Sequence, residues 1–170
     1  MSNLLPPGYC LLTGSTLDRS LLVKFLQRTY RELFPTGEVD HLALTVEQYF
    51  SKETPLWWVE WTDPDAPPLD GMPSARSIHP IAGLWLGNAI DQVNGDRHAH
   101  IFLLYVTPNH RRRGLGSALV RYAENWARAR GDQQIGLQVF QSNQPALHLY
   151  QAMGYQTQSL WMVKFLNKDR

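Results

Sequence analysis

The chain has 170 residues, enough for one domain with a sizeable hydrophobic core. Its 16 Lys and Arg against 15 Asp and Glu leave a net charge of +1, which argues against an overall field that would hold it on nucleic acid or an anionic membrane. The single cysteine, Cys10, excludes an internal disulfide and fits a reducing compartment. Because no stretch approaches 18 apolar residues and no leader pattern opens the sequence, we expect one soluble, cytoplasmic domain over residues 1–170.

The first half of the chain predicts strands and two helices. A short strand is expected over 9–14, and a helix over 16–33, where apolar residues recur at helical spacing behind Thr16 as a cap. A second helix is expected over 45–53. Aromatic and β-branched runs predict three strands, and between the first two lies a loop that holds five of the eleven prolines and predicts a functional or mobile connection. These strands are expected over 56–62, 81–87 and 99–106, and the proline-rich loop over 63–80.

The second half of the chain alternates helices and strands. Residues 115–130 and 143–153 predict helices, closed by Gly131 and Gly154 respectively. Strands are expected over 134–140 and 159–165. Strands without long helices between them in the first half, followed by this alternation, predict an α/β (α+β mixed) fold with a mixed sheet flanked by helices.

A basic, glycine-containing turn follows the strand expected over 99–106. Three arginines at 111–113 precede Gly114 and Gly116, and an amphipathic helix begins at once. Glycines let the backbone approach a ligand closely, and a helix start offers unpaired N–H groups and the positive end of the helix dipole. This combination predicts phosphate binding. Two nucleotide-binding motifs are excluded. The Lys-Ser or Lys-Thr pair of a P-loop is absent, and Leu119 stands where a dinucleotide-binding fingerprint needs glycine or alanine.

Two motifs resemble those of the GNAT superfamily of N-acetyltransferases. The stretch "VTPNHRRRGLGSALV" is similar to the acyl-CoA loop of that family, which commonly reads V-x-P-x-x-R-G-x-G-x-G, with Arg112 where glycine is common. The stretch "NQPALHLYQAMGY" is similar to the family pattern N-x-x-A-x-x-L-Y-x-x-x-G-F/Y. Two motifs at the expected separation are more specific than either alone. The resemblance covers residues 99–155 and is only architectural before them.

The resemblance implies a fold and a cosubstrate. The fold is a central mixed, mostly antiparallel sheet of about six to seven strands, with two parallel strands splayed around the pantetheine arm of acetyl-CoA. The arm would pair with backbone groups of Leu104, Tyr105 and Val106, and Asn143 would steady it. The pyrophosphate would lie over backbone amides, with guanidinium groups adding charge-assisted contacts. The residues that the resemblance assigns to this loop are Arg111, Arg112, Arg113, Gly114, Leu115, Gly116 and Ser117.

The resemblance also implies a reaction, the transfer of the acetyl group of acetyl-CoA to a primary amine by direct attack in a ternary complex. The amine would belong to a small molecule or a peptide. The amide of Val106 would donate to the thioester oxygen, and Tyr150 would act as the general acid. The strand before the loop lacks the glutamate that some family members place there, so the general base stays open between His100, His98, Glu60 and water.

Other interpretations of these residues stay open. The same fold could serve a non-catalytic acyl-CoA-binding or sensing module, and Asn143 could be a plain helix cap. Nucleic-acid binding through the arginines is disfavoured by the near-zero net charge and by the lack of a second basic cluster. The pair His98 and His100 lacks a third ligand, so no metal site is expected. Most aromatic residues of the strands at 56–62 and 159–165 are expected in the core, and one or two could instead line an acceptor pocket or a homodimer surface.

Overall fold

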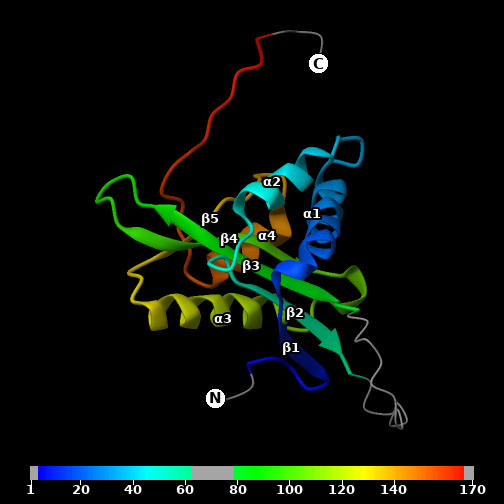
Figure 1. Cartoon of the computed structure of the whole chain (residues 1–170). Helices are drawn as coiled ribbons and strands as arrows, with labels where there is room; N and C mark the ends of the chain where they lie inside the picture. The colour runs from blue at the N-terminus through cyan, green and yellow to red at the C-terminus, as the bar shows by residue number, and fades with distance from the viewer. Residues whose placement is uncertain (1–3, 63–78, 167–170) are drawn as a thin grey trace.

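The structure, a computed structural model, describes residues 4–62 and 79–166. It is a five-stranded sheet in the order β1-β2-β3-β4-β5, with helices on both faces (Figure 1). The strands are β1 (Tyr9–Thr13), β2 (Leu56–Trp61), β3 (Ala82–Ile90), β4 (Arg97–Val106) and β5 (Ile135–Leu137). The helices are α1 (Arg19–Leu33), α2 (His41–Tyr49), α3 (Leu115–Arg130) and α4 (Gln144–Ala152), with 3-10 turns η1 (Thr16–Asp18) and η2 (Pro108–His110).

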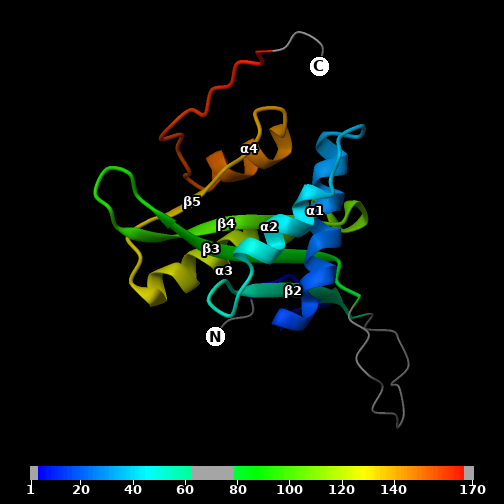
Figure 2. The same ribbon diagram turned by 45° about the horizontal axis from the view of Figure 1, so that its top comes forward.

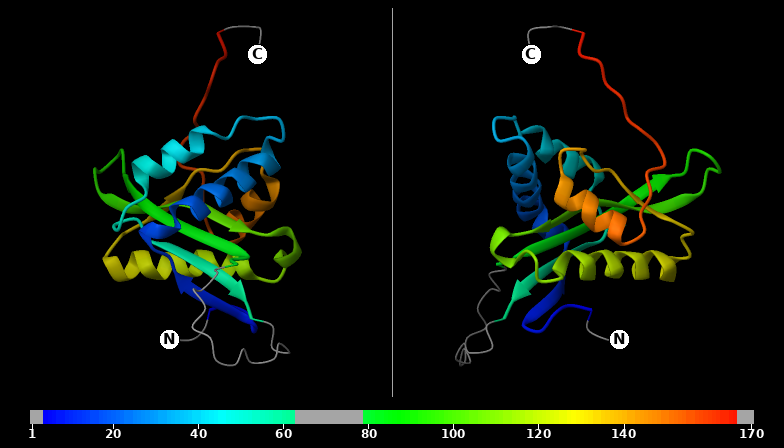
Figure 3. Two further views of the ribbon diagram at one scale, coloured as in Figure 1. Left: turned by 45° about the vertical axis from the view of Figure 1, so that its right-hand side comes forward. Right: turned by 180° about the vertical axis from the view of Figure 1, so that it is seen from behind.

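Two apolar clusters hold the helices against opposite faces of the sheet. Strands β1 to β4 are antiparallel neighbours, and β4 pairs with β5 in parallel. Trp57 and Val59 of β2 join the cluster beneath α3, whereas Trp58 joins the cluster beneath α1 and α2. Successive side chains of this strand therefore enter opposite clusters, as the alternation of a β-strand requires. Figure 3 shows α1 and α2 on one side of the sheet and α3 on the other.

Several predicted boundaries move by a few residues. The cap of the first helical turn is Ser15, which forms a capping box with Asp18, and not Thr16. The second helix covers 41–49 rather than 45–53, because the loop after α1 is short and Asp40 already begins the helical backbone. Helix α3 has the predicted bounds and ends at Gly131, whose φ of 91° is left-handed. The predicted loop over 63–80 falls almost entirely on residues outside the described ranges.

The strand predicted over 159–165 is not formed in this chain. Residues 156–166 follow α4 as an exposed, irregular segment that runs away from the sheet (Figure 1). The expected count of six to seven strands is therefore too high by at least one for the described residues, although the mixed, mostly antiparallel class is right. A strand needs a neighbour to accept its ladder of hydrogen bonds, and this segment has none within the described chain.

Strands β4 and β5 part soon after they meet. They pair only over Ala99 to Ile101, and β5 ends at Leu137 while β4 continues to Val106. The predicted strand over 134–140 is shorter for this reason. Near the parting point, Trp85 pairs with Leu103 and the next residue of β3 pairs with Ile101, so β4 carries an extra residue there. Such a bulge bends a strand and increases its twist, which turns β4 away from β5.

The extra residue is Phe102, and the opposite strand is shaped to receive it. Its ring lies 4.8 Å from the ring of Trp85 and covers Gly87, where an added Cβ would overlap the phenyl carbons. The glycine is thus required for space rather than for backbone freedom. The bulge that separates β4 from β5 rests on this contact.

We expect Gly87→Ala to destabilise the fold by about 1–3 kcal/mol, the usual cost of overpacking. Urea denaturation with an unchanged m-value measures this loss. In a Phe102→Ala background the same substitution should cost much less, because the ring that clashes is gone. Equal costs in the two backgrounds would show that the ring does not restrict this position.

Candidate functional site

The loop between β4 and α3 holds two residues in left-handed backbone conformations. Gly114 has φ of 82° and Arg112 has φ of 61°. An L-residue other than glycine pays about 1–2 kcal/mol for this conformation. Arg112 stands where the family pattern commonly has glycine, so the backbone keeps the shape that glycine would adopt freely.

Unpaired amides gather at the start of α3. The amides of His110 and Arg111 donate to Thr107 and Pro108, and the amide of Ala118 donates to Gly114. Between them, the amides of residues 112–117 donate to no protein acceptor within the described chain. A run of N–H groups at the positive end of a helix dipole suits an anionic ligand, and the phosphate site expected from the sequence stays a prediction.

Two of the three loop arginines are held by distant elements. Arg111 donates to both carboxylate oxygens of Glu32 on α1, at 2.7 and 2.9 Å, and its Nε donates to the carbonyl of Val106 at 2.8 Å. Arg113 donates to the hydroxyl of Tyr9 on β1 at 3.2 Å. Arg112 is exposed and has no partner among the described residues. Its guanidinium group is therefore the one best able to reach a ligand.

Tyr9 also contacts a histidine in the loop. Its hydroxyl forms a hydrogen bond with Nδ1 of His110 at 2.9 Å and accepts from Arg113. Burial, and then the charge of Arg113, lower the pKa of His110 below its usual value of 6.5. The chain Arg113 to Tyr9 to His110 ties the loop to the first strand.

Beyond the parting point, β4 presents an open backbone edge. The amide of Thr107 donates to Ile81 of β3, and since backbone groups alternate along a strand, those of Val106 and Leu104 face the gap toward β5. The backbone of Tyr105 faces β3 instead, opposite Gly83. Arg111 donates to the carbonyl of Val106, whereas the amide of Val106 has no acceptor within the described chain.

Two further polar groups lie at this gap. Tyr105 donates its hydroxyl to Glu32 at 2.7 Å, and burial, then the hydrogen bond to Glu32, raises the pKa of Tyr105 to about 12. The hydroxyl of Thr107 is buried without a partner among the described residues. An orphaned hydroxyl beside unpaired amides fits a polar ligand at this place.

Helix α4 brings the second motif to the same region. It packs against the start of α3, where Leu149 lies next to Gly116, and it lies beside β5 (Figure 2). Tyr150 is 9% exposed, and burial raises the pKa of Tyr150 to about 12, so its hydroxyl stays protonated at neutral pH. Asn143 caps the helix by accepting from the amide of Ala146 at 3.3 Å. The capping role is therefore observed, and a role toward a ligand stays a prediction.

The structure separates the predicted base candidates from the gap. His98 is buried with Nδ1 2.9 Å from the carbonyl of Ala99, and His100 lies six residues before Val106, about 20 Å away along the strand. Burial, and then the neighbouring His98, lower the pKa of His100. Glu60 accepts the amide of His79 at 3.1 Å. None of these contacts joins a candidate base to the gap.

Sequence reasoning missed the carboxylate that does lie at the gap. Glu32 is 73 positions before Tyr105 and 79 before Arg111, and no local spacing in the sequence signals the contact. An aromatic cluster stands nearby on the same helix end. Its members, which join α1 to the start of α2 and to the residues just after β5, are Tyr30, Phe34, His41 and Phe140.

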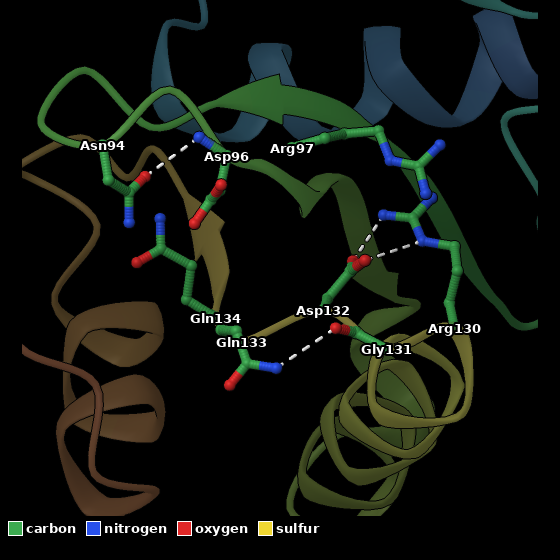
Figure 4. Close-up of a pocket in the computed structure, with 8 residues that line it drawn as sticks. All are labelled: Asn94, Asp96, Arg97, Arg130, Gly131, Asp132, Gln133 and Gln134. Carbon is green, nitrogen blue, oxygen red and sulfur yellow. Dashed lines mark hydrogen bonds and ion pairs between the residues drawn. The ribbon is translucent and has the colours of Figure 1, made fainter.

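A polar pocket of about 320 Å³ lies far from this gap, at the opposite end of α3 (Figure 4). Since α3 has 16 residues, the pocket is about 24 Å from the loop. Its polar groups largely bind one another, as Arg130 pairs with Asp132 and Gln133 donates to Gly131. The described residues contain no group of three or more side chains placed to bind a metal ion. The described helices include none long and apolar enough to cross a membrane.

Comparisons with known proteins agree with this arrangement. The family model described as "Acetyltransferase (GNAT) family" matches residues 21–155. Streptothricin acetyltransferase of Streptomyces lavendulae is 44% identical over 50 residues, which are 29% of this chain and 26% of that protein. The crystal structure of a predicted acetyltransferase from Clostridium acetobutylicum, solved with acetyl-CoA, superposes with a TM-score of 0.69 at 18% identity, covering 93% of this chain and 96% of that one. An aminoglycoside 6'-N-acetyltransferase of Acinetobacter baumannii gives a TM-score of 0.60 at 21% identity, covering 94% and 99%.

The Tyr9 contact makes a prediction about His110. Its pKa, read from an NMR titration of the imidazole Cε1 proton, should lie below 6.5. Arg113→Gln should raise it, because a nearby positive charge is removed, whereas Arg128→Gln at the other end of α3 should not change it. The stability linked to neutral His110 is complete above pH 6.5 and is lost as pH falls through the lowered folded-state value. A pKa at or above 6.5 would show that burial and the charge of Arg113 do not act on this imidazole.

Proposed function

Since the chain belongs to the GNAT family of acetyltransferases, we propose that it transfers the acetyl group of acetyl-CoA to a primary amine by direct attack in a ternary complex. The observation that carries the proposal is the open edge of β4, which leads straight into a loop of unpaired amides at the start of α3. An extended ligand with a phosphate at one end matches both features.

The binding part of the proposal follows from the gap. The backbone groups of Leu104 that face β5 would pair with the amides of the pantetheine arm, as a neighbouring strand would. The amides of residues 112–117 would receive the pyrophosphate, and Arg112 would add a charge-assisted contact. The hydroxyl of Thr107, which lacks a partner in the described chain, supports a polar occupant at the junction.

The catalytic part of the proposal assigns two groups. Acetyl-CoA supplies the activated thioester. The free amide of Val106 would donate to the thioester oxygen, which gains negative charge as the amine attacks. Tyr150 would give its proton to the departing thiolate, and its raised pKa keeps that proton in place before the reaction. A fixed donor of this kind needs no rearrangement at the moment of transfer.

For the acceptor, we infer an amine that enters beside the end of α1. Exposed faces of the aromatic cluster there offer cation–π contacts to an ammonium group, and Phe34 and Phe140 are 39% and 41% exposed. Since His100 is too far along β4, water between the amine and polar groups of the gap is the proposed route for the amine proton. Glu32 is already bound by Arg111 and Tyr105, so we do not propose it as the base. Its negative charge would attract the ammonium form of the acceptor.

An acceptor panel tests the proposal. Purified protein with acetyl-CoA would be offered a polyamine, single amino acids, a peptide, streptothricin and an aminoglycoside, and thiol release and acetylated product would both be measured. We expect stoichiometric product with at least one amine. Tight binding of acetyl-CoA without transfer to any of them would argue for a binding module instead.

We expect Tyr150→Phe to keep acetyl-CoA affinity and to lower the chemical rate by about 10² to 10⁴, the usual size of a general-acid contribution. Single-turnover kinetics measure the step itself. Tyr155→Phe is the matched control, since the ring of Tyr155 lies 5.5 Å from that of Tyr150 in a tilted arrangement, and this substitution should change the rate little. A wild-type rate in Tyr150→Phe would reject the acid role.

We expect Arg112→Gly to weaken acetyl-CoA binding about tenfold, the lower end for a hydrogen bond to a charged group, without loss of stability. Glycine adopts the required φ freely, so the loop shape should persist while one charge is removed. Calorimetric titration at two salt concentrations would show a smaller salt dependence than in the wild type. Arg128→Gln controls for net charge. Unchanged affinity would show that Arg112 faces solvent in the complex.

A further inference from the structure

The segment after α4 exposes a continuous run of large apolar side chains. Among residues 160–166 only Lys164 is polar, and soluble monomers rarely leave such a patch open. The exposed fractions are Leu160 73%, Trp161 81%, Met162 85%, Val163 58%, Phe165 80% and Leu166 87%.

This segment has the pattern of a strand. Trp161, Val163 and Phe165 fall on one face of an extended backbone, because side chains alternate. Lys164 lies on the other face, and a lysine in such a position opposes open-ended edge pairing. The views of Figures 1 and 3 show the segment leading away from the body of the chain. It is therefore extended, apolar and unpaired in the described chain.

The same chain carries a matching edge. β5 is the last strand of the sheet and pairs on one side only, with β4. Residues 56–59 of β2 and 82–87 of β3 are buried, whereas the apolar residues around β5 are only partly buried. They are Ile135 and Leu137 of β5, Leu149 and Met153 of the α4 region, and Tyr155.

We propose that residues 159–165 form a strand on the free edge of β5 in a second copy of this chain, with the exchange made in both directions. Each chain holds one segment that can pair, residues 159–165, and one free edge, that of β5. In a two-fold dimer each segment therefore pairs with the β5 edge of the other chain, and no edge is left open. The main-chain hydrogen bonds would come from strand addition, and the apolar face of Trp161 would cover the half-buried residues around β5. This proposal does not depend on the acetyl-transfer chemistry.

The apolar area is sufficient for a stable dimer. Aromatic side chains bury about 150–250 Å² each, so Trp161 and Phe165 from both chains would remove roughly 600–1,000 Å² from water. The aliphatic side chains of the segment and the covered residues around β5 add to this. Stable interfaces bury about 1,200–2,000 Å² in total, which the exchanged pair reaches.

The mass of the wild-type protein is the first test. Light scattering should give twice the 19.5 kDa chain mass from about 1 to 100 μM, the range over which weak complexes dissociate. Isotope-filtered NMR on a refolded mixture of labelled and unlabelled copies should then show contacts between β5 of one copy and residues 161–165 of the other. A monomer, or a dimer whose contacts of this kind lie only within one chain, would overturn the proposal.

Variants test which side chains carry the contact. Trp161→Glu with Phe165→Glu should raise the dimer dissociation constant at least about 100-fold, because the two charges would have to leave water. The control, Gln156→Glu with Gln158→Glu, adds the same charge just before the strand and should leave the dimer intact. Circular dichroism verifies that both variants fold. A dimer unaffected by the first pair of substitutions would also overturn the proposal.

Discussion

The parting of β4 and β5 is the constraint on which the candidate site depends. A single extra residue, Phe102, bends β4 after only three residue pairs with β5, and the space that its ring needs is supplied by Gly87 on the facing strand. The proposed binding of the pantetheine arm depends on this bend. The backbone groups of Leu104 and Val106 that face β5 have no strand partner, at the end of the sheet where the glycine loop and α3 begin.

The loop itself is shaped from outside. Arg111 is drawn to Glu32 on α1, and Arg113 is drawn to Tyr9 on β1, so the two flanking arginines serve as tethers in this chain. The Arg111 pair is partly exposed, so its energetic contribution is modest, and its effect is mainly on position. Held on both sides, the backbone between them keeps Arg112 in a conformation that an arginine would otherwise avoid.

Local patterns predicted the elements well. The sequence predicted helix α3 with its terminal Gly131, strand β2 and the glycine loop before α3. Each of these depends on residues that are close in sequence. The parting of two parallel strands was implied by the family resemblance, and the short pairing of β4 with β5 agrees with it. Roles of single residues toward acetyl-CoA stay predictions.

Long-range contacts were not predictable in this way. Glu32 meets Tyr105 and Arg111 only because α1 crosses the sheet at that point, and nothing around position 32 in the sequence indicates it. The segment 159–165 illustrates the opposite error. Its alternation predicts a strand, and this prediction is wrong for the described chain, because a strand forms only beside a partner and none is present there.

The pairing of Glu32 with Arg111 has a consequence for recombination between relatives. The end of α1 carries aromatic residues of the proposed acceptor side. The same turns carry Glu32, the carboxylate that positions the loop after β4. A chimera that imports α1 from a relative to change acceptor preference would also import whatever stands at position 32. Positions 32 and 111 should therefore be exchanged together, since a mismatched pair would leave Arg111 without its carboxylate and shift the loop.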